Sequence, residues 1–408
     1  MIGNAEGTIN VNVDQALSNV GRLESGLNNV TGNTAGGMSG LASNILKNEA
    51  AITTVGRAGI GFGAVIAGGM GLAINSAATF EQTMSGVEAV MGPQVFAQFG
   101  TQLSDLALKL GKDTVYSAND AGLAIEELGK QGISAQDILS GAGKAVTSLA
   151  SATGTDLYTS ATITANAMNQ FAIQGKDAGS VADILTNGAN ASSASVGSLG
   201  EGLTYVGGTA HALHIPLTDT VTALSELADN GLKGSIGGTA LNDVLLRMVS
   251  PVGKAKKGMD ALGLSAGQAN SVFEADGQTL KPLGQVIGEV STATAGMGDA
   301  TKQAYLKQIY GIQGARAINA LLSGQEKQLA GTGKGWSDYA KEIGQTGTAD
   351  AQAKIRLDNL KGSMEQLKGS VETLAIRFGS TFLPAIRAVV DGITAFVNLM
   401  LTLPQPVL

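Results

Sequence analysis

The apolar residues near the C-terminal end of the chain recur with the spacing of a coiled coil. Over residues 357–378 they step alternately three and four positions, which fills the a and d positions of successive heptads. Two lysine–glutamate pairs, Lys361 with Glu365 and Lys368 with Glu372, support the same helix across one turn. The pattern predicts a long amphipathic helix with a seam for association with another helix. The seam consists of Leu357, Leu360, Met364, Leu367, Val371, Leu374 and Phe378.

The composition favours helices that pack closely through small residues. Glycine accounts for 58 of the 408 residues, about twice its usual share of roughly 7%. Charged residues make up only 14% of the chain and hydrophobic residues 44%, so much of the chain is expected to be buried in the fold or against partners. At ~100–200 residues per domain, the length allows two or three domains.

Charge and residue types exclude several functional classes. The net charge is −7 and no cluster of Lys or Arg is visible, so we expect no direct sequence-specific binding of nucleic acid. The absence of cysteine excludes disulfides, thiolate metal sites and a cysteine nucleophile. Residues 1–30 lack a basic region followed by an apolar one, so no secretory signal is predicted and the protein is expected to begin in the cytoplasm.

No motif for catalysis, metal or cofactor binding is recognisable. Gly333-Lys334-Gly335 lacks the flanking residues of a phosphate-binding loop. His211 and His214 stand three apart without a nearby acid to complete a metal site, and are interpreted as structural. The carboxylate pair Glu126 and Glu127 is interpreted as helix surface. The sequence therefore predicts a protein that is not an enzyme.

The N-terminal region, residues 1–57, combines a strand pattern with a helix pattern. Thr8–Asp14 alternates apolar and polar residues, which predicts one short strand. Residues 16–30 then carry apolar side chains at helical spacing, typical either of an ordinary amphipathic helix or of a self-associating coil. A flexible connector rich in Gly and Ser is expected over residues 31–44.

Residues 58–79 form a glycine-rich apolar segment within a run that carries no charge. Its length could cross a bilayer as a helix. Gly59 and Gly63, and likewise Ala67 and Gly71, stand four apart, a spacing that allows close contact between helices. Three interpretations stay open: a transmembrane helix, a segment that inserts into a membrane or lines a pore under some conditions, and a helix buried in a protein assembly.

Residues 80–325 are expected to form a multi-helix core of short helices. Ser117 and Ser134 each stand three residues before an aspartate, as in a capping box, and each precedes an apolar helical pattern. Glycines such as Gly154 and Gly231 are placed to end such helices. A linker is predicted over residues 326–350, followed by the heptad-bearing helix and an apolar C-terminal helix over residues 351–408. The predicted fold class is therefore all-α, with long amphipathic helices at either end.

Ten short sequence segments resemble the conserved core of phage tail tape measure proteins and its usual continuation. They occur in the same order as in that family and span roughly residues 78–398. The segments are ATFEQTM at 78–84, AIEELGKQGIS at 124–134, NAMNQF at 166–171, NASSASV at 190–196, LADNGLKGS at 227–235, GTAL at 238–241, FEADG at 273–277, YGIQGARA at 310–317, NLKGS at 359–363 and FLPAI at 382–386.

The resemblance implies a structural role in the virion. Proteins of this family run through the tail tube lumen, set tail length by a long helical part and leave the tube during DNA ejection. The implied partners are the tail tube protein, tail assembly chaperones and tail tip proteins, with self-association through helices and contact with the host membrane during ejection. Assembly would take place in the host cytoplasm. The alternative function is a membrane-active pore or ejection protein that acts through residues 58–79.

The long helical part that sets tail length acts as a ruler. The resemblance also implies that most of this ruler lies outside this chain. A helix rises 1.5 Å per residue, so all 408 residues in one helix would span on the order of 600 Å. A compact core shortens that considerably. We therefore expect the ruler to continue beyond Leu408, and we expect no wall-degrading domain in this chain.

Overall fold

The computed structural model describes residues 72–384, 386–387, 390–391 and 394. The chain divides into two units, Met1–Gly71 and Leu72–Leu408, and all described residues belong to the second unit. The predicted strand Thr8–Asp14 and the N-terminal amphipathic helix lie outside the described residues. So do Gly59, Gly63, Ala67 and Gly71.

The described residues are predominantly helical, which confirms the all-α prediction for this part of the chain. A first helix covers residues 72–91. The elements that follow are α4 (Pro93–Asp113), α5 (Ala118–Lys130), α6 (Ala135–Asp137), the π-helix η1 (Ile138–Ala142), α7 (Gly143–Thr153), α8 (Leu157–Phe171), the 3-10 helix η2 (Gly175–Asp177), α9 (Ala178–Ala191), α10 (Val196–Ala212), α11 (Leu217–Asp229), α12 (Gly234–Val249), α13 (Lys254–Leu262), α14 (Leu283–Thr294), α15 (Asp299–Leu329), α16 (Trp336–Ile343), α17 (Thr348–Leu357) and α18 (Leu360–Ser380).

Side-chain caps start two of these helices where the sequence predicts them. The Ser117 hydroxyl accepts a hydrogen bond from the backbone N–H of Asp120, and the Asp120 carboxylate accepts one from the Ser117 N–H, both at 3.0 Å. Ser134 likewise accepts from the N–H of Asp137 at 3.1 Å. These bonds satisfy amides that have no partner within the helix, so α5 and α6 begin directly after the two serines.

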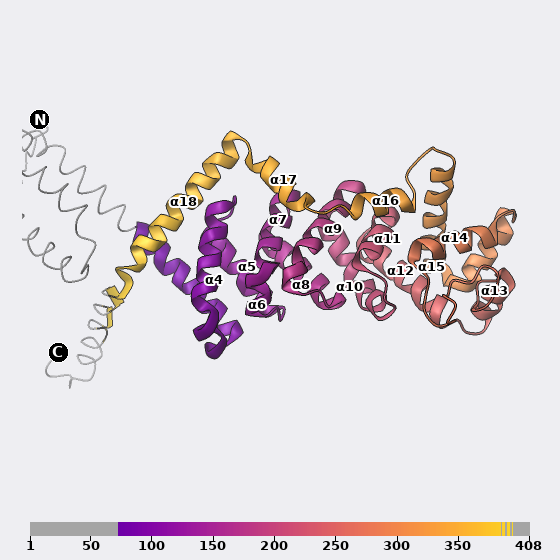
Figure 1. The fold of residues 1–408 in the computed structure, drawn as a ribbon, viewed down its shortest axis with the longest axis horizontal. Helices are drawn as coiled ribbons and strands as arrows, with labels where there is room; N and C mark the ends of the chain where they lie inside the picture. The colour runs from indigo at the N-terminus through magenta and orange to yellow at the C-terminus, as the bar shows by residue number, and fades with distance from the viewer. Residues whose placement is uncertain (1–71, 385, 388–389, 392–393, 395–408) are drawn as a thin grey trace, which may run out of the picture. The chain divides into compact units, whose positions relative to one another are not determined.

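Successive helices pack against one another along the chain (Figure 1). Helix α4 packs on α5, α5 on α8, α8 on α10, α10 on α12 and α12 on α15, while α7 and α9 pack beside α8. One hydrophobic core gathers buried residues from Phe80 to Ile376. Helix α11 is surrounded by α9, α10, α12, α15 and α16, and its residues from Thr220 to Ala228 are all buried. A helix covered on all sides has no need of a charged face, which explains the apolar and small polar composition of α11.

Helix α15 is longer than the short helices expected for the core. It runs for 31 residues, and its path is broken only at Gly311, whose φ of 71° and ψ of −174° lie outside the helical region. A positive φ suits glycine because other residues would place Cβ against the following carbonyl oxygen. The sequence YGIQGARA therefore marks a kink within one long element.

The chain after α15 returns along the helices that precede it. We call residues 330–357 the returning segment. Its helix α16 packs on α9 and α11, and its helix α17 packs on α7 and α9. The prediction of a linker over residues 326–350 is wrong, because α15 continues to Leu329 and the side chains of Tyr339 and Ile343 are buried in the core. The glycines that suggested a linker lie in the short turn before α16.

The boundary predicted between residues 79 and 80 is also wrong. Residues 72–79 belong to the helix over 72–91, and Ala73 and Ala77 on it are buried. Gly379 of α18 comes so close to this helix that an added Cβ would lie 2.1 Å from the carbonyl oxygen of Ala73. Part of the apolar segment is thus packed within the second unit. Among the described residues, no helix is long and apolar enough to cross a membrane.

Candidate functional site

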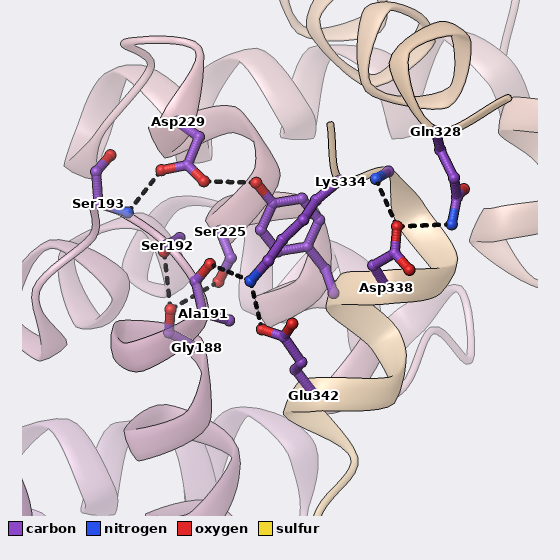
Figure 2. A network of polar contacts seen from close by, with 12 residues as sticks. Gly188, Ala191, Ser192, Ser193, Ser225, Asp229, Gln328, Lys334, Asp338 and Glu342 are labelled. Carbon is purple, nitrogen blue, oxygen red and sulfur yellow. Dashed lines mark hydrogen bonds and ion pairs between the residues drawn. The ribbon is translucent and has the colours of Figure 1, made fainter. Parts of the chain in front are cut away.

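The returning segment is held by polar side chains at the end of α11 (Figure 2). Asp229, the last residue of α11, accepts hydrogen bonds from the Tyr339 hydroxyl of α16 and from the backbone N–H of Ser193. Burial opposes ionisation of Asp229, but the hydrogen bonds from Tyr339 and Ser193 outweigh it and lower the pKa. An ionised carboxylate therefore fixes α16 against α11.

Lys334 anchors the turn that leads into α16. Its ammonium group donates to the backbone carbonyl of Ala191 at 3.3 Å and pairs with Glu342 at 2.6 Å, as Figure 2 shows. The same nitrogen lies 5.6 Å from the centre of the Tyr339 ring, within the range of a cation–π contact. Lys334, which lies in the region predicted to be a linker, thus joins α9 to α16.

Two buried residues of α9 hold the connection between α16 and α17. The Asn187 amide donates to the carbonyl oxygens of Ile343 and Gln345. The Asp183 carboxylate accepts from the backbone N–H groups of Gly347 and Ala349 at 2.7 and 2.9 Å. Helix N-termini leave amides unpaired and carry partial positive charge, so this carboxylate acts as a cap supplied from a different helix.

Glu226 differs from these anchors because it is buried without a partner. It lies on α11, its side chain is 1% exposed, and neither carboxylate oxygen has a hydrogen-bond partner. It faces Gly324 of α15 so closely that an added Cβ there would lie 1.7 Å from Oε1. Burial raises the pKa of Glu226 to about 8, with Lys327 opposing the shift and Asp229 adding to it.

Asp183, Asn187 and Glu226 were not predicted as anchors from the sequence, and Asp229 and Lys334 appeared only as parts of longer motifs. One signal was present in α11: Asp219, Glu226 and Asp229 are its only charged residues among apolar and small polar side chains, so an acid in this helix was a candidate for a buried or paired group. The contacts that join these residues to the returning segment, or Lys334 to α9, span more than a hundred positions along the chain, and nothing in local spacing connects them.

The predicted seam is not one continuous helix. Helix α17 ends at Leu357 and α18 begins at Leu360, with Asp358 and Asn359 between them. The Asn359 side chain accepts from the N–H of Gly362 at 2.9 Å and so caps the start of α18. Leu357 is therefore separated from the rest of the seam, and the expectation of unbroken heptads over 357–378 is wrong at this point.

Five seam residues of α18 face outward. They have 44% to 68% of their surface exposed, although all are large and apolar: Met364, Leu367, Val371, Leu374 and Phe378. Within the described residues no element covers this row of side chains. The structure thus places the strongest periodicity of the sequence on the surface of the unit. We call these five residues the exposed seam.

The opposite face of α18 is the one that packs. It consists mainly of small residues, with Gly362, Gly369, Thr373 and Gly379 buried beside Ile376. A Cβ at Gly369 would lie 2.1 Å from the carbonyl oxygen of Gly111, at the end of α4. These positions correspond to b, c and f of the heptad, so docking of α18 leaves its a and d positions free.

A groove of about 620 Å³ lies between the helix over 72–91, α4 and α18. Phe80, Met84 and Ile376 contribute apolar lining. Glu81 and Arg387 at its edge pair with each other. Their charges are thus engaged within the protein, and we assign no ligand to the groove.

The ionisable pairs noted in the sequence have structural contacts. Glu126 pairs with Lys130, whereas Glu127 is buried and accepts hydrogen bonds from Gln131 and Thr162, so the interpretation of both as helix surface is wrong for Glu127. His211 packs edge-on against the ring of Phe171. In the described part of the chain, no three or more His, Asp or Glu side chains are grouped as metal ligands would be.

Comparison with known proteins identifies the family. Residues 104–311, which are half of the chain, match the family described as phage-related minor tail protein. Over 325 residues, or 78% of this chain, it is 30% identical to the tape measure protein of Pneumococcus phage Dp-1. The chain therefore belongs to the phage tail tape measure protein family.

The match covers only part of that relative. The chain spans 27% of the length of the tape measure protein of phage Dp-1. No solved structure matches the chain. The helical unit over residues 72–394 is therefore described from its own contacts rather than by comparison.

Proposed function

We propose that this chain works in the tail tube lumen as part of the tape measure that sets tail length and assists DNA ejection. The partners in this proposal are the tail tube protein, the tail assembly chaperones and the tail tip proteins, with assembly in the host cytoplasm. Family membership and the helical architecture support a structural part for the chain in the virion.

The observation that carries the proposal is the exposed seam of α18. A folded unit rarely leaves five large apolar side chains in a row on its surface unless they meet a partner. The helix docks on α4 through small residues and keeps the seam free. The seam would thus let the folded unit and an associating helical rod exist in the same chain.

The partner that fits the exposed seam best is a second copy of this chain in parallel orientation. Lys361 and Lys368 occupy e positions, and Ser363 and Ser370 occupy g positions. In a parallel pair, e residues face g residues of the other helix, so each lysine meets a serine. In an antiparallel pair, e residues face one another and the lysines would repel. Charge therefore favours copies aligned in the same direction.

Tail length tests the proposed function directly. In the phage that carries the full-length protein, deletion of whole heptads from the helical part should shorten the tail by about 10 Å per heptad, since a helix rises 1.5 Å per residue. Tails would be measured by electron microscopy, with heptad insertions as the matched control that should lengthen them. Unchanged length in both sets of variants would rule out the ruler function.

A further inference from the structure

Glu226 stands where three elements of the unit meet. Its carboxylate lies against Gly324 of α15, and the carbonyl oxygen of Gly324 would lie 2.7 Å from a Cβ added to Gly335, the residue directly before α16. Tyr339 of α16, bonded to Asp229 one turn further along α11, is close enough for the charge of Glu226 to act on its hydroxyl. Neither carboxylate oxygen of Glu226 accepts a hydrogen bond at this junction.

The charges around Glu226 do not neutralise it. Lys327 on α15 attracts a negative charge there, whereas Asp229 on its own helix repels it. Lys334 and Glu342 from the returning segment pair with each other. Among the acids of the other helices that pack on α11, Asp183 caps α17, Glu201 lies against Gly234 and Glu326 pairs with Lys302.

Protonation of Glu226 and docking of the returning segment are therefore linked. A carboxylic acid without donors is tolerated in this position when neutral, whereas the ionised form would be a buried charge with a like charge beside it. Opening of the interface lets water reach the carboxylate and returns it to an ordinary acid. Because the pKa is raised in the docked state, docking is favoured at low pH and weakens as pH rises towards the raised value.

We infer that Glu226 is a proton-dependent switch that holds the returning segment against α11 and α15 when protonated and promotes its release when ionised. Release would detach α16 from α11 and α15. The connection from α15 to α17 and α18 would then no longer be held against the core. A segment of 28 residues, counted from 330 to 357, could then extend to as much as about 90 Å. The inference concerns the folded unit itself and does not depend on the ruler function.

Hydrogen exchange of the full chain tests the switch. After correction for intrinsic exchange, protection of the α16 amides should fall by up to about tenfold per pH unit between about pH 5 and 8 and level off above, because opening then releases one proton. Glu226→Gln should remove this slope, since the amide cannot ionise. Protection in α8, which packs on α5, α7, α9 and α10 rather than on the returning segment, should not follow the same curve.

Glu127→Gln is the matched control. Glu127 is also a buried glutamate on a helix, but it has hydrogen-bond partners, so its variant should keep the wild-type slope at α16. Trp336, the sole tryptophan of the chain, lies at the start of α16 and gives a second readout through fluorescence quenching. Protection of α16 in the wild type that varies less than about twofold over this range would overturn the inference, whether or not the glutamine variant folds.

Discussion

Gly202 and Gly238 allow α10 and α12 to meet through their backbones. A Cβ at Gly238 would lie 2.3 Å from the carbonyl oxygen of Gly202, closer than any side chain can approach. Some glycines make no such contact. Gly208, also on α10, is exposed and has nothing within 4 Å of an added Cβ. The high glycine content of the chain thus combines residues that define helix contacts with residues that only cost helix stability.

Gly238→Ala and Gly208→Ala should have opposite effects on stability. The first forces α10 and α12 apart and should lower the free energy of unfolding by about 1–3 kcal/mol. The second should raise it by roughly 0.5–1 kcal/mol, because alanine is the better helix former. Chemical denaturation followed by circular dichroism measures both values. Equal effects of the two substitutions would contradict the backbone contact.

Helix α18 shows within one element why periodicity and packing can differ. Its a and d residues form the regular pattern, yet the face buried in this unit is built from Gly362, Gly369 and Gly379 with Thr373 and Ile376. Small residues give no apolar signal in the sequence although they allow the closest approach. The seam could therefore be predicted from the sequence, whereas the intramolecular contact of α18 could not.

Self-association of the chain should depend on the exposed seam. Leu367→Glu places a charge at a d position and should lower association by at least about tenfold, since burial of an unpaired charge is costly. Ser363→Glu adds the same charge at an exposed g position, which in a parallel pair faces Lys368 of the other copy. This substitution should therefore leave association unchanged or strengthen it. Sedimentation equilibrium of the full chain measures both.

The orientation of the copies decides how this pair of variants behaves. If Ser363→Glu disrupts association as strongly as Leu367→Glu, the parallel arrangement is wrong. If neither variant changes it, the exposed seam is not the contact between copies. Both variants should keep their helices, because both positions are exposed in the single chain, and circular dichroism is the measurement that checks this.

For the molecule as a whole, contacts distant in sequence close the fold. Helices α4 to α15 follow one another along the chain, and the residues after α15 lead back over them. Helix α16 packs on α9 and α11, α17 packs on α7 and α9, and α18 packs on α4. The returning segment is fixed by the buried side chains of Tyr339 and Ile343 together with polar contacts from Asp183, Asn187 and Asp229. Its docking can therefore respond to a change at a few polar residues.

Residues 72–394 should fold without the preceding unit. One core gathers buried residues from Phe80 to Ile376, so the fragment should unfold in a single transition whose midpoint lies within about 3 °C of that of the full chain. A shorter fragment, residues 72–329, lacks the buried Tyr339 and Ile343 and should unfold at a clearly lower temperature. Calorimetry compares the three chains. Equal midpoints for both fragments would show that the returning segment adds no stability.

The helical class, the helix starts at Ser117 and Ser134 and the family could all be predicted from the sequence, because caps, apolar periodicity and short motifs are local properties. Three features depended on the tertiary structure: residues 326–350 contain a packed helix, the heptad pattern breaks at Asn359, and Glu226 is buried without a partner. The packed helix and the burial of Glu226 depend on which distant backbone approaches which residue. The break at Asn359 is a local cap that the regular heptad pattern concealed. Glycine-mediated contacts and buried carboxylates leave no periodic trace, so no local pattern could have revealed them.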